Sequence, residues 1–459
     1  MKRALSEYAR ACGGELVGAD RAYSGVSTDT RTLKAGDLFV ALRGPRFNAN
    51  DFVTAAETAG AAGAVVDTRT DRPLPQIVVR DTQDALTRAA AAWRAQFSIP
   101  LVGVAGSNGK TTVKEMIAAI LERRGATLAT RGNLNNHIGV PLTLYRLEAA
   151  HRHAVVEIGA NRAGEVAALL RLARPTVGLI TNAGAEHLEG FGSLEGVARA
   201  EGEMVAGLDA SATAVINADD EFADLWRGMT RARVATFGIA NAAEYSAQET
   251  HTIIDASGFV TRYRLLAPQG SIPIELRLAG QHNVLNSLCA AAAACAAGAS
   301  LDDVRAGLAT MRPVPGRLQL KTAPSGAWIV DDSYNANPSS MKAGIEVLSS
   351  VDARRWLIMG DMGELGDYAD ESHEDIGRFA RNHRIDRLFA TGKLSALAVE
   401  AFGAGGEWFA DTESLARAVN AELTREVCVL VKGSRSSRLE RVVEALVGRP
   451  SQDGNNGTH

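Results

Sequence analysis

The sequence predicts an α/β protein of three domains. The chain has 459 residues, enough to build about three separate cores. Short apolar runs alternate with helical segments along most of its length, as in α/β domains with crossover connections. A stiff Arg-Pro-Val-Pro-Gly segment at residues 312–316 cannot continue a helix and marks a boundary. We therefore expect a small α/β N-terminal domain over 1–97, a central domain with a mostly parallel sheet over 98–313, and a Rossmann-like α/β C-terminal domain over 314–450.

The N-terminal domain combines two short apolar runs with a helix of small residues. LFVALRG (38–44) and IVVR (77–80) are typical of strands, and VTAAETAGAAG (53–63) is typical of a helix that glycine ends. A polar cluster at residues 27–31 comes just before the first strand. On composition alone this cluster is either an ordinary turn or a binding segment.

The central domain shows the clearest alternation of strands and helices. Four apolar runs are expected as strands: LVGVAG (101–106), HAVVEIG (153–159), TVGLITN (176–182) and TAVINAD (213–219). The first is followed by a helix over 112–125, for which Gly125 is the expected stop. One stripe of this helix is apolar: Val113, Met116, Ile117, Ile120 and Leu121.

The C-terminal domain repeats the alternation on a smaller scale. Its expected strands are WIVDD (328–332), WLIMGD (356–361), RLFATG (387–392) and VCVLVKG (427–433). The last segment, residues 451–459, has no apolar side chain to bury, and we expect it to be disordered.

The composition excludes several classes of protein. The net charge is −4, and the 49 basic and 53 acidic residues are evenly mixed, so no basic run predicts a nucleic-acid partner. No stretch is long and apolar enough for a membrane span, and Glu7 and Arg10 interrupt the place of a signal peptide. The four cysteines form no CxxC pair, which fits a reducing compartment. We expect a cytoplasmic protein.

The most informative segment is a glycine-rich loop between the first central strand and its helix. It reads Gly106, Ser107, Asn108, Gly109, Lys110, Thr111 and Thr112. Glycines let successive backbone N–H groups turn toward phosphate oxygens, and the helix N-terminus adds partial positive charge. Lys110 is expected to reach the outer phosphates and Thr111 to ligate Mg²⁺. The standard pattern would have its first glycine at Val104, so this is a shorter form, GxxGKTT.

Two further side chains follow central strands at the edge where ligands of open α/β sheets collect. Glu157 ends the second strand, and His187 lies in a glycine-rich loop after the third. Either residue alone would more often be structural. Their positions beside the expected phosphate site favour a role in holding metal.

Eight motifs resemble those of a known family, in the same order. They are GSNGKTT, EIGAN, HLEGFGS, GQHNVLNS, PGR, DDSYNANPSSM, GDMGELG and KGSRS, and the resemblance as a whole extends from about residue 27 to residue 447. The chain is similar on these motifs to the Mur ligases of peptidoglycan synthesis. Motifs so widely spread are much more specific than the phosphate loop alone.

The resemblance implies an enzyme that uses ATP and Mg²⁺ to form an amide bond through an acyl phosphate. Within the family, the chain looks like the ligases that add D-alanyl-D-alanine to UDP-N-acetylmuramoyl-tripeptide. These small molecules are the implied partners, and a monomer is the expected state. The N-terminal domain is implied to bind the UDP-sugar, and the C-terminal domain to close over ATP on a hinge at 312–316.

The resemblance also implies roles for residues at matching positions. ATP and magnesium would be bound by the phosphate loop with Glu157, His187, Asn283, Arg317, Asp332, Asn335 and Asn337. The UDP-sugar would be held by Ser27, Thr28, Asp29, Arg31, Asn135 and Asn136. Lys432 and Arg435 would meet an incoming carboxylate, although surface cations at a strand end are almost as good an interpretation.

At one position this chain has a residue of opposite charge to the one that many members of the family have. Fourteen residues beyond His187, many Mur ligases have a lysine that reacts with carbon dioxide to form a carbamate, which binds the second magnesium. This chain has Glu201 there. We hypothesise that Glu201 serves the second Mg²⁺ directly or through water, and the alternative is a solvated acid on a helix face.

Three other classes of protein fit the sequence less well. The related ligase that adds a diamino acid carries Asp-Asn-Pro-Arg, whereas here Asn337-Pro338 is followed by Ser339. Folylpolyglutamate synthase lacks the N-terminal domain, and a GTPase switch would carry an Asn-Lys-x-Asp motif that this sequence lacks. Asn50 stands where the family often has histidine, which bears on the local substrate contact.

Overall fold

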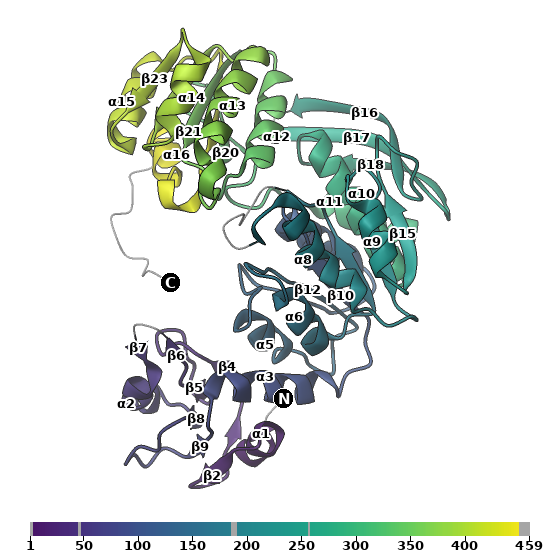
Figure 1. The fold of residues 1–459 in the computed structure, drawn as a ribbon, viewed down its shortest axis with the longest axis vertical. Helices are drawn as coiled ribbons and strands as arrows, with labels where there is room; N and C mark the ends of the chain where they lie inside the picture. Colours follow the sequence, from purple (N-terminus) through teal and green to yellow (C-terminus); the bar gives the residue numbers. More distant parts are fainter. Residues whose placement is uncertain (1–2, 45–46, 185–190, 256–257, 449–459) are drawn as a thin grey trace.

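A computed structural model describes residues 3–44, 47–184, 191–255 and 258–448. They form three α/β units in series, with the N-terminal and C-terminal units on opposite sides of the central one (Figure 1). Two sequence predictions, His187 and the tail at 451–459, lie outside the described residues. No helix in the described part of the chain has the length and apolar character needed to cross a membrane.

The N-terminal unit is built on a five-stranded sheet in the order β2-β9-β8-β5-β4. Only β2 and β9 pair antiparallel. The strands are β2 (Glu15–Val17), β4 (Val26–Ser27), β5 (Leu38–Val40), β8 (Gly63–Val66) and β9 (Gln76–Val78). The helices are α1 (Leu5–Cys12), α2 (Val53–Thr58) and α3 (Thr82–Arg94), and short pairs join β1 (Arg3–Ala4) to β3 (Ala22–Tyr23) and β6 (Arg43–Gly44) to β7 (Phe47–Asn48).

Two elements of this unit are shorter than predicted. The strand expected over 38–44 ends at Val40, and the chain then turns into the β6–β7 hairpin. The helix expected over 53–63 ends at Thr58, because the chain must reach Gly63 in time to start the buried strand β8.

The central unit has a six-stranded, fully parallel sheet in the order β11-β12-β10-β13-β14-β15, which confirms the predicted parallel architecture. Its strands are β10 (Leu101–Ala105), β11 (Thr127–Ala129), β12 (His153–Glu157), β13 (Val177–Ile180), β14 (Thr213–Asn217) and β15 (Arg233–Phe237). Its helices are α4 (Lys110–Leu121), α5 (Gly139–Leu144), α6 (Glu165–Ala173), α8 (Leu194–Ala206), α9 (Ala223–Met229), α10 (Gln281–Ala296) and α11 (Leu301–Thr310). Because β12 and β13 flank β10 on opposite sides, the carboxyl ends of these three strands border one crevice.

Two features of the central unit differ from the sequence prediction. Helix α4 ends at Leu121, one turn before Gly125, and a tighter turn of i→i−3 hydrogen bonds follows it. A three-stranded antiparallel sheet was not predicted at all; it consists of β16 (Ser246–Asp255), β17 (Gly258–Ala267) and β18 (Gly270–Leu276). It leads directly into α10, whose first turn borders the cleft.

The C-terminal unit is a second six-stranded sheet, in the order β19-β20-β24-β21-β22-β23, with only β19 antiparallel. Its strands are β19 (Gln319–Thr322), β20 (Trp328–Asp332), β21 (Arg354–Gly360), β22 (Arg387–Thr391), β23 (Gly406–Phe409) and β24 (Val427–Lys432). Its helices are α12 (Pro338–Ser349), α13 (Ala369–Asn382), α14 (Ser395–Phe402), α15 (Thr412–Glu422) and α16 (Glu440–Leu446). The last strand in sequence, β24, lies between β20 and β21, so the ends of β20 and β24 are neighbours.

The N-terminal unit is docked on the central unit by α3. The guanidinium of Arg94 is buried and donates hydrogen bonds to the carbonyl oxygens of Ala173 and Arg174, which end helix α6. The indole of Trp93 donates to the carbonyl oxygen of Leu147. One hydrophobic cluster runs through both units. Of the two clusters in the C-terminal unit, one is confined to it and the other also includes Phe259 and Ala279 of the central unit.

Candidate active site

The phosphate loop follows β10 and opens α4, as the sequence predicted. Gly106 has φ +117°, and a Cβ there would lie 2.2 Å from the Thr181 hydroxyl, so only glycine fits. Gly109 caps α4 in the left-handed region, with φ +83°. Val104 is fully buried inside β10. The loop is short because the strand continues through Val104 to Ala105, past the position of the first glycine in the standard pattern.

Lys110 lies folded over this loop. Its ammonium donates to the carbonyl oxygen of Gly106 at 2.5 Å and to that of Ser107 at 2.9 Å. Both carbonyls belong to the segment that faces the cavity. The lysine is thus held where it can exchange these oxygens for those of a phosphate chain.

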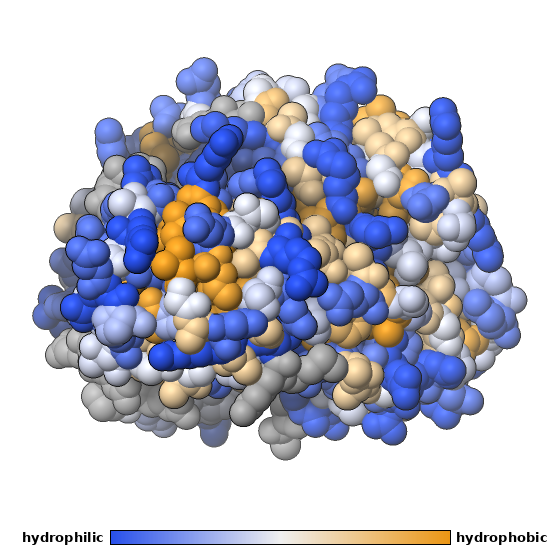
Figure 2. All heavy atoms as spheres, turned by 90° about the horizontal axis from the view of Figure 1, so that it is seen from below, coloured by the Kyte–Doolittle hydropathy of each residue, from blue (hydrophilic) through white to orange (hydrophobic). Residues whose placement is uncertain are grey.

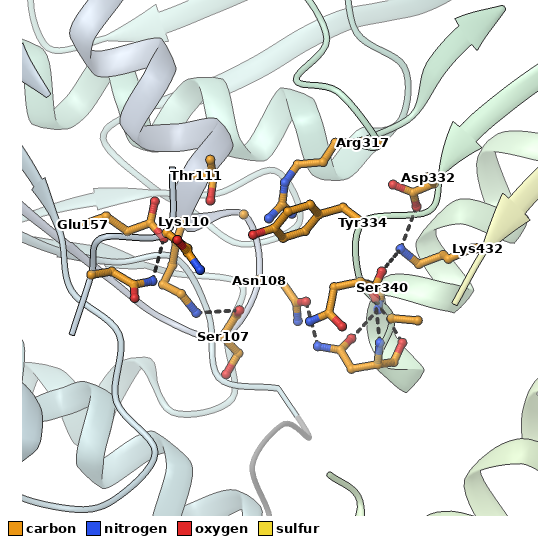
Figure 3. Close-up of a pocket in the computed structure, with 17 residues that line it drawn as sticks. Ser107, Asn108, Lys110, Thr111, Glu157, Arg317, Asp332, Tyr334, Ser340 and Lys432 are labelled. Carbon is orange, nitrogen blue, oxygen red and sulfur yellow. Dashed lines mark hydrogen bonds and ion pairs between the residues drawn. The ribbon is translucent and has the colours of Figure 1, made fainter. Parts of the chain in front are cut away.

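The cavity beside the loop is formed by the central and C-terminal units together, as Figure 3 shows. We call it the polar pocket and define it by Lys110, Thr111, Glu157, Arg317, Asp332 and Lys432. It brings together most of the predicted nucleotide residues, including also Ser107, Asn108, Gly109, Asn335 and Asn337. It also includes Asn135, which was predicted to hold the UDP-sugar.

Glu157 reaches the polar pocket from the end of β12 and is only 3% exposed. Its Oε1 accepts a hydrogen bond from the Asn135 side chain at 3.0 Å. Among the described residues its Oε2 has no hydrogen-bond partner, although the Lys114 ammonium lies 3.9 Å away. Burying a carboxylate oxygen without a hydrogen-bond partner costs free energy unless a further group binds it.

Lys114 was missed by the sequence analysis. It is fully buried, donates to the carbonyl oxygen of Thr130 at 2.8 Å and pairs with Glu115 at 2.9 Å. The signal was present, since this lysine lies one turn after Lys110 between the apolar residues Val113 and Met116. A charge at such a position must find a partner inside the protein.

Glu201 proves to be buried rather than solvated. It is 2% exposed on α8, and its Oε2 accepts a hydrogen bond from the backbone amide of Gly106 at 2.7 Å. It therefore lies behind the phosphate loop, outside the lining of the two pockets that the described residues form at the cleft. The alternative of a solvated surface acid is excluded.

The C-terminal unit contributes a buried ion pair. The Lys432 ammonium donates to Asp332 Oδ2 at 2.7 Å and to the carbonyl oxygen of Asn335 at 3.0 Å. Lys432 is 3% exposed, so the alternative of a surface cation is wrong for this residue. Burial raises the pKa of Asp332, and the charge of Lys432 opposes this shift.

Arg435 is different, because its side chain is 68% exposed and its contact with Glu440 is 3.4 Å long. Its guanidinium lies 5.8 Å from the centre of the Tyr334 ring, and that of Arg317 lies 4.6 Å from the same ring. Tyr334 lines the polar pocket but was not singled out from the sequence. Its place within the DDSYNANP motif was the available signal.

A second cavity adjoins the first and shares Asn108, Arg317 and Lys432 with it. We call it the apolar pocket, because its lining includes Leu278, Leu285, Met311, Val314 and Leu318. Asn283 lines it, as does Thr112. His282, missed by the sequence analysis, lines it as well; burial, with a further contribution from Lys432, lowers its pKa to about 4.

Of the predicted UDP-sugar residues, Asn135 lines the polar pocket, and the others line neither of the two pockets. Ser27, Asp29 and Arg31 form a turn in the N-terminal unit, in which the Asp29 carboxylate binds the Arg31 guanidinium at 2.7 Å. Thr28 belongs to the same segment. Asn136 uses its side chain to accept from the backbone amides at the start of α5. In the N-terminal unit Asn50 is buried and donates to Asp67.

The chain matches two families described for the Mur ligases. Residues 104–294 match the Mur ligase middle domain, and residues 316–435 match the Mur ligase glutamate ligase domain. Over 444 residues the chain is 43% identical to the UDP-N-acetylmuramoyl-tripeptide–D-alanyl-D-alanine ligase of Escherichia coli, covering 96% of this chain and 98% of that one.

Solved structures with the same fold agree with this match. A crystal structure of MurF from Acinetobacter baumannii has a TM-score of 0.91 at 32% identity, covering 98% of this chain and 99% of that one. The MurF ligase of Thermotoga maritima, crystallised in complex with ADP, has a TM-score of 0.81 at 26% identity, covering 92% and 97%. The chain therefore belongs to the Mur ligase family, and within it to the group of UDP-N-acetylmuramoyl-tripeptide–D-alanyl-D-alanine ligases.

Proposed function

We propose that the cleft between the central and C-terminal units joins D-alanyl-D-alanine to UDP-N-acetylmuramoyl-tripeptide, with ATP as the phosphate donor. The observation that carries this proposal is the polar pocket itself. It combines a phosphate loop, a buried carboxylate and an ion pair from a second unit in one cavity. The crystallised complex of a related ligase with ADP supports nucleotide binding here.

The reaction needs activation, because a carboxylate and an ammonium group do not condense at neutral pH. The terminal carboxylate of the tripeptide attacks the γ-phosphate of ATP, and an acyl phosphate and ADP form. The free amine of D-alanyl-D-alanine then attacks the acyl carbon, and phosphate leaves from the tetrahedral intermediate. The protein contributes alignment and charge stabilisation rather than covalent chemistry.

Lys110 and the start of α4 handle the phosphate chain in this proposal. The ammonium leaves the carbonyl oxygens of Gly106 and Ser107 and follows the charge that develops on the transferred phosphoryl group. The backbone amides at the start of α4 bind the remaining phosphate oxygens in this proposal. Those of Gly106, Ser107 and Asn108 are not available, because they donate to Glu201 and Asn182.

The residues present fit a divalent cation. Glu157 offers a buried oxygen that lacks a hydrogen-bond partner among the described residues, and the Thr111 side chain lines the same pocket. Bound Mg²⁺ supplies charge neutralisation for the phosphate oxygens. We further propose that His187 and Glu201 serve a second cation, Glu201 from behind the loop. Asn135 then orients Glu157 rather than binding the sugar.

We propose that the apolar pocket binds the adenine, with Asn283 and the neutral imidazole of His282 at its polar edge. Arg317 extends over Tyr334 toward the phosphates, and the Asp332–Lys432 pair orders the strand ends around them. The exposed Arg435 is the cation that we assign to the carboxylate of the dipeptide. Ser27, Thr28, Asp29, Arg31 and Asn136 are proposed to hold the UDP-sugar.

Water must be excluded from the acyl phosphate, so the C-terminal unit is proposed to close over ATP. The connection between α11 and β19 contains the segment 312–316, which adopts neither helix nor strand and is the proposed hinge.

Phosphate release tests this function. The purified protein is incubated with ATP, Mg²⁺ and UDP-N-acetylmuramoyl-tripeptide, and D-alanyl-D-alanine, D-alanine or a diamino acid is added in turn. Sustained release with D-alanyl-D-alanine, accompanied by the pentapeptide product, is the expected result. Sustained release that requires the diamino acid instead would contradict the assignment.

A further inference from the structure

Three side chains form a closed ring of hydrogen bonds between the phosphate loop and the C-terminal unit. The Asn108 amide donates to the Ser339 hydroxyl at 3.0 Å, and this hydroxyl donates to Asn337 Oδ1 at 3.1 Å. The Asn337 amide donates back to Asn108 Oδ1 at 2.8 Å. Asn337 and Ser339 begin helix α12, more than 200 residues after the loop in sequence. Figure 3 shows Asn108 reaching toward this helix.

The backbone of Asn108 is held independently of this ring. Its amide nitrogen donates to Asn182 Oδ1 and its carbonyl accepts from Asn182 Nδ2, both at 3.0 Å. The shape of the phosphate loop is thus set by Asn182, at the end of β13. The Asn108 side chain is left for contact with the other unit.

The start of α12 is likewise held without Asn108. Asn337 Oδ1 accepts from the backbone amide of Ser340, and the Ser340 hydroxyl accepts from the backbone amide of Asn337, a capping box. The helix therefore does not need the ring for its own stability. What the ring fixes is the position of the two units relative to each other.

The packing around the ring is close. A Cβ on Gly184 would lie 2.9 Å from the Asn108 amide nitrogen and 3.2 Å from the Ser339 hydroxyl. Asn108 also lines both the polar and the apolar pocket, so the ring lies beside both of them.

We infer that Asn108 is a positioning residue that couples the phosphate loop to closure of the C-terminal unit. The inference rests on the proposed function, in which Asp332, Lys432 and Arg435 must face the phosphate loop during both chemical steps. Because the ring closes only when α12 abuts the loop, it stabilises the arrangement in which the acyl phosphate is shielded from water and reached by the amine.

Two substitutions open the ring from opposite sides. Asn108→Ala keeps the backbone bonds to Asn182, and Ser339→Ala keeps the capping box of α12. Ser349→Ala, at the far end of the same helix, is the matched control, since that hydroxyl bonds only within its own helix turn.

Each ring variant is expected to lower kcat/KM for D-alanyl-D-alanine by about threefold to tenfold, the effect of one or two partly exposed hydrogen bonds. Phosphate released per amide formed should rise above one, because an opened cleft admits water to the acyl phosphate. The double variant should be no worse than the more impaired single variant, because either substitution already breaks the same ring. The Ser349→Ala control should match the wild type.

Small-angle scattering of the full chain without substrates gives a readout independent of turnover, and both ring variants should show a larger radius of gyration. The inference would be overturned if the effects of the two substitutions on kcat/KM simply add in the double variant. It would also be overturned if the ring variants keep the radius of gyration and the phosphate-to-amide ratio of the wild type. If the wild type itself forms no amide, the proposed function fails, while scattering still decides whether the ring holds the units together.

Discussion

The backbone amide of Gly106 donates a hydrogen bond to the buried carboxylate of Glu201, with 2.7 Å between the nitrogen and Oε2. This bond ties helix α8 to the first residue of the phosphate loop. Glu201 thus has a structural role that its sequence position did not reveal, in addition to the metal role that we propose. The two roles can be separated, because only one of them requires a negative charge.

Glu201→Gln keeps an oxygen that can accept from Gly106 but removes the charge. We expect the Mg²⁺ concentration for half-maximal activity to rise severalfold, with the melting temperature within a few degrees of the wild type. Glu201→Leu also removes the acceptor and should destabilise the protein by about 1–3 kcal/mol, since a buried amide loses its partner. An unchanged Mg²⁺ dependence in the glutamine variant would leave Glu201 as a loop anchor alone.

Lys110→Met should abolish phosphoryl transfer while leaving the protein folded. The ammonium stabilises developing charge, and loss of such a group typically slows turnover by about a hundredfold to a thousandfold. The measurement is ADP formation in the presence of the tripeptide substrate, with circular dichroism as the folding control. Retention of more than a tenth of the wild-type rate would argue against the assigned role.

Glu157→Gln should reduce activity strongly and also destabilise the protein. Lys114 would lose one of its two carboxylate partners, at a cost of about 1 kcal/mol because Glu115 remains. Adding Lys114→Met should restore the melting temperature without restoring activity. A melting temperature of the Glu157→Gln/Lys114→Met variant below that of Glu157→Gln alone would show that the two buried charges are not coupled as described.

Acid should destabilise the protein through His282. Its pKa is about 4 when folded, and an unfolded histidine has a pKa of about 6.5. The unfolded state therefore binds the proton first, so the stability from this residue is complete above pH 6.5 and is lost as the pH falls toward 4, by up to about 1.4 kcal/mol per pH unit.

His282→Gln should reduce the loss of stability between pH 6.5 and pH 4. Urea unfolding at pH 7, 5.5 and 4.5 measures how the free energy of unfolding changes with pH. His251→Gln, which replaces an exposed side chain on β16, serves as the control and should keep the wild-type slope. An identical slope in the His282 variant would show that other groups cause the acid sensitivity.

Arg435→Gln should raise the KM for D-alanyl-D-alanine by about tenfold, as expected for a charge-assisted hydrogen bond to a carboxylate. The KM for ATP should change little, because this side chain is exposed at the edge of the cleft. Lys432→Gln should behave differently and lower stability, since it leaves Asp332 buried without its cation. Equal effects of Arg435→Gln on both KM values would contradict the acceptor role.

The sequence was sufficient where the structure depends on neighbouring residues. The turn at Gly106 and Gly109 requires backbone conformations that glycine adopts readily, and the apolar runs identify the strands of both large sheets. The end of Glu157's strand follows from the same pattern. These features are local, so a single sequence contains their cause.

The sequence was insufficient for the boundaries of several elements and for the antiparallel sheet of β16, β17 and β18. The lengths of α2 and α4 depend on where the next strand must begin, and packing decides that point. Long antiparallel strands with mixed polar and apolar residues carry a weaker pattern than buried parallel ones.

The sequence by itself determined the phosphate loop, the parallel α/β architecture and the family. Only the tertiary structure decided the partners of the charges: Lys432 pairs with Asp332 because β24 is inserted beside β20, and Glu201 is buried against Gly106 because α8 packs behind the loop. The physical reason is that a buried charge or amide must find its partner in space. Strand order and helix packing bring together residues that lie far apart in the sequence.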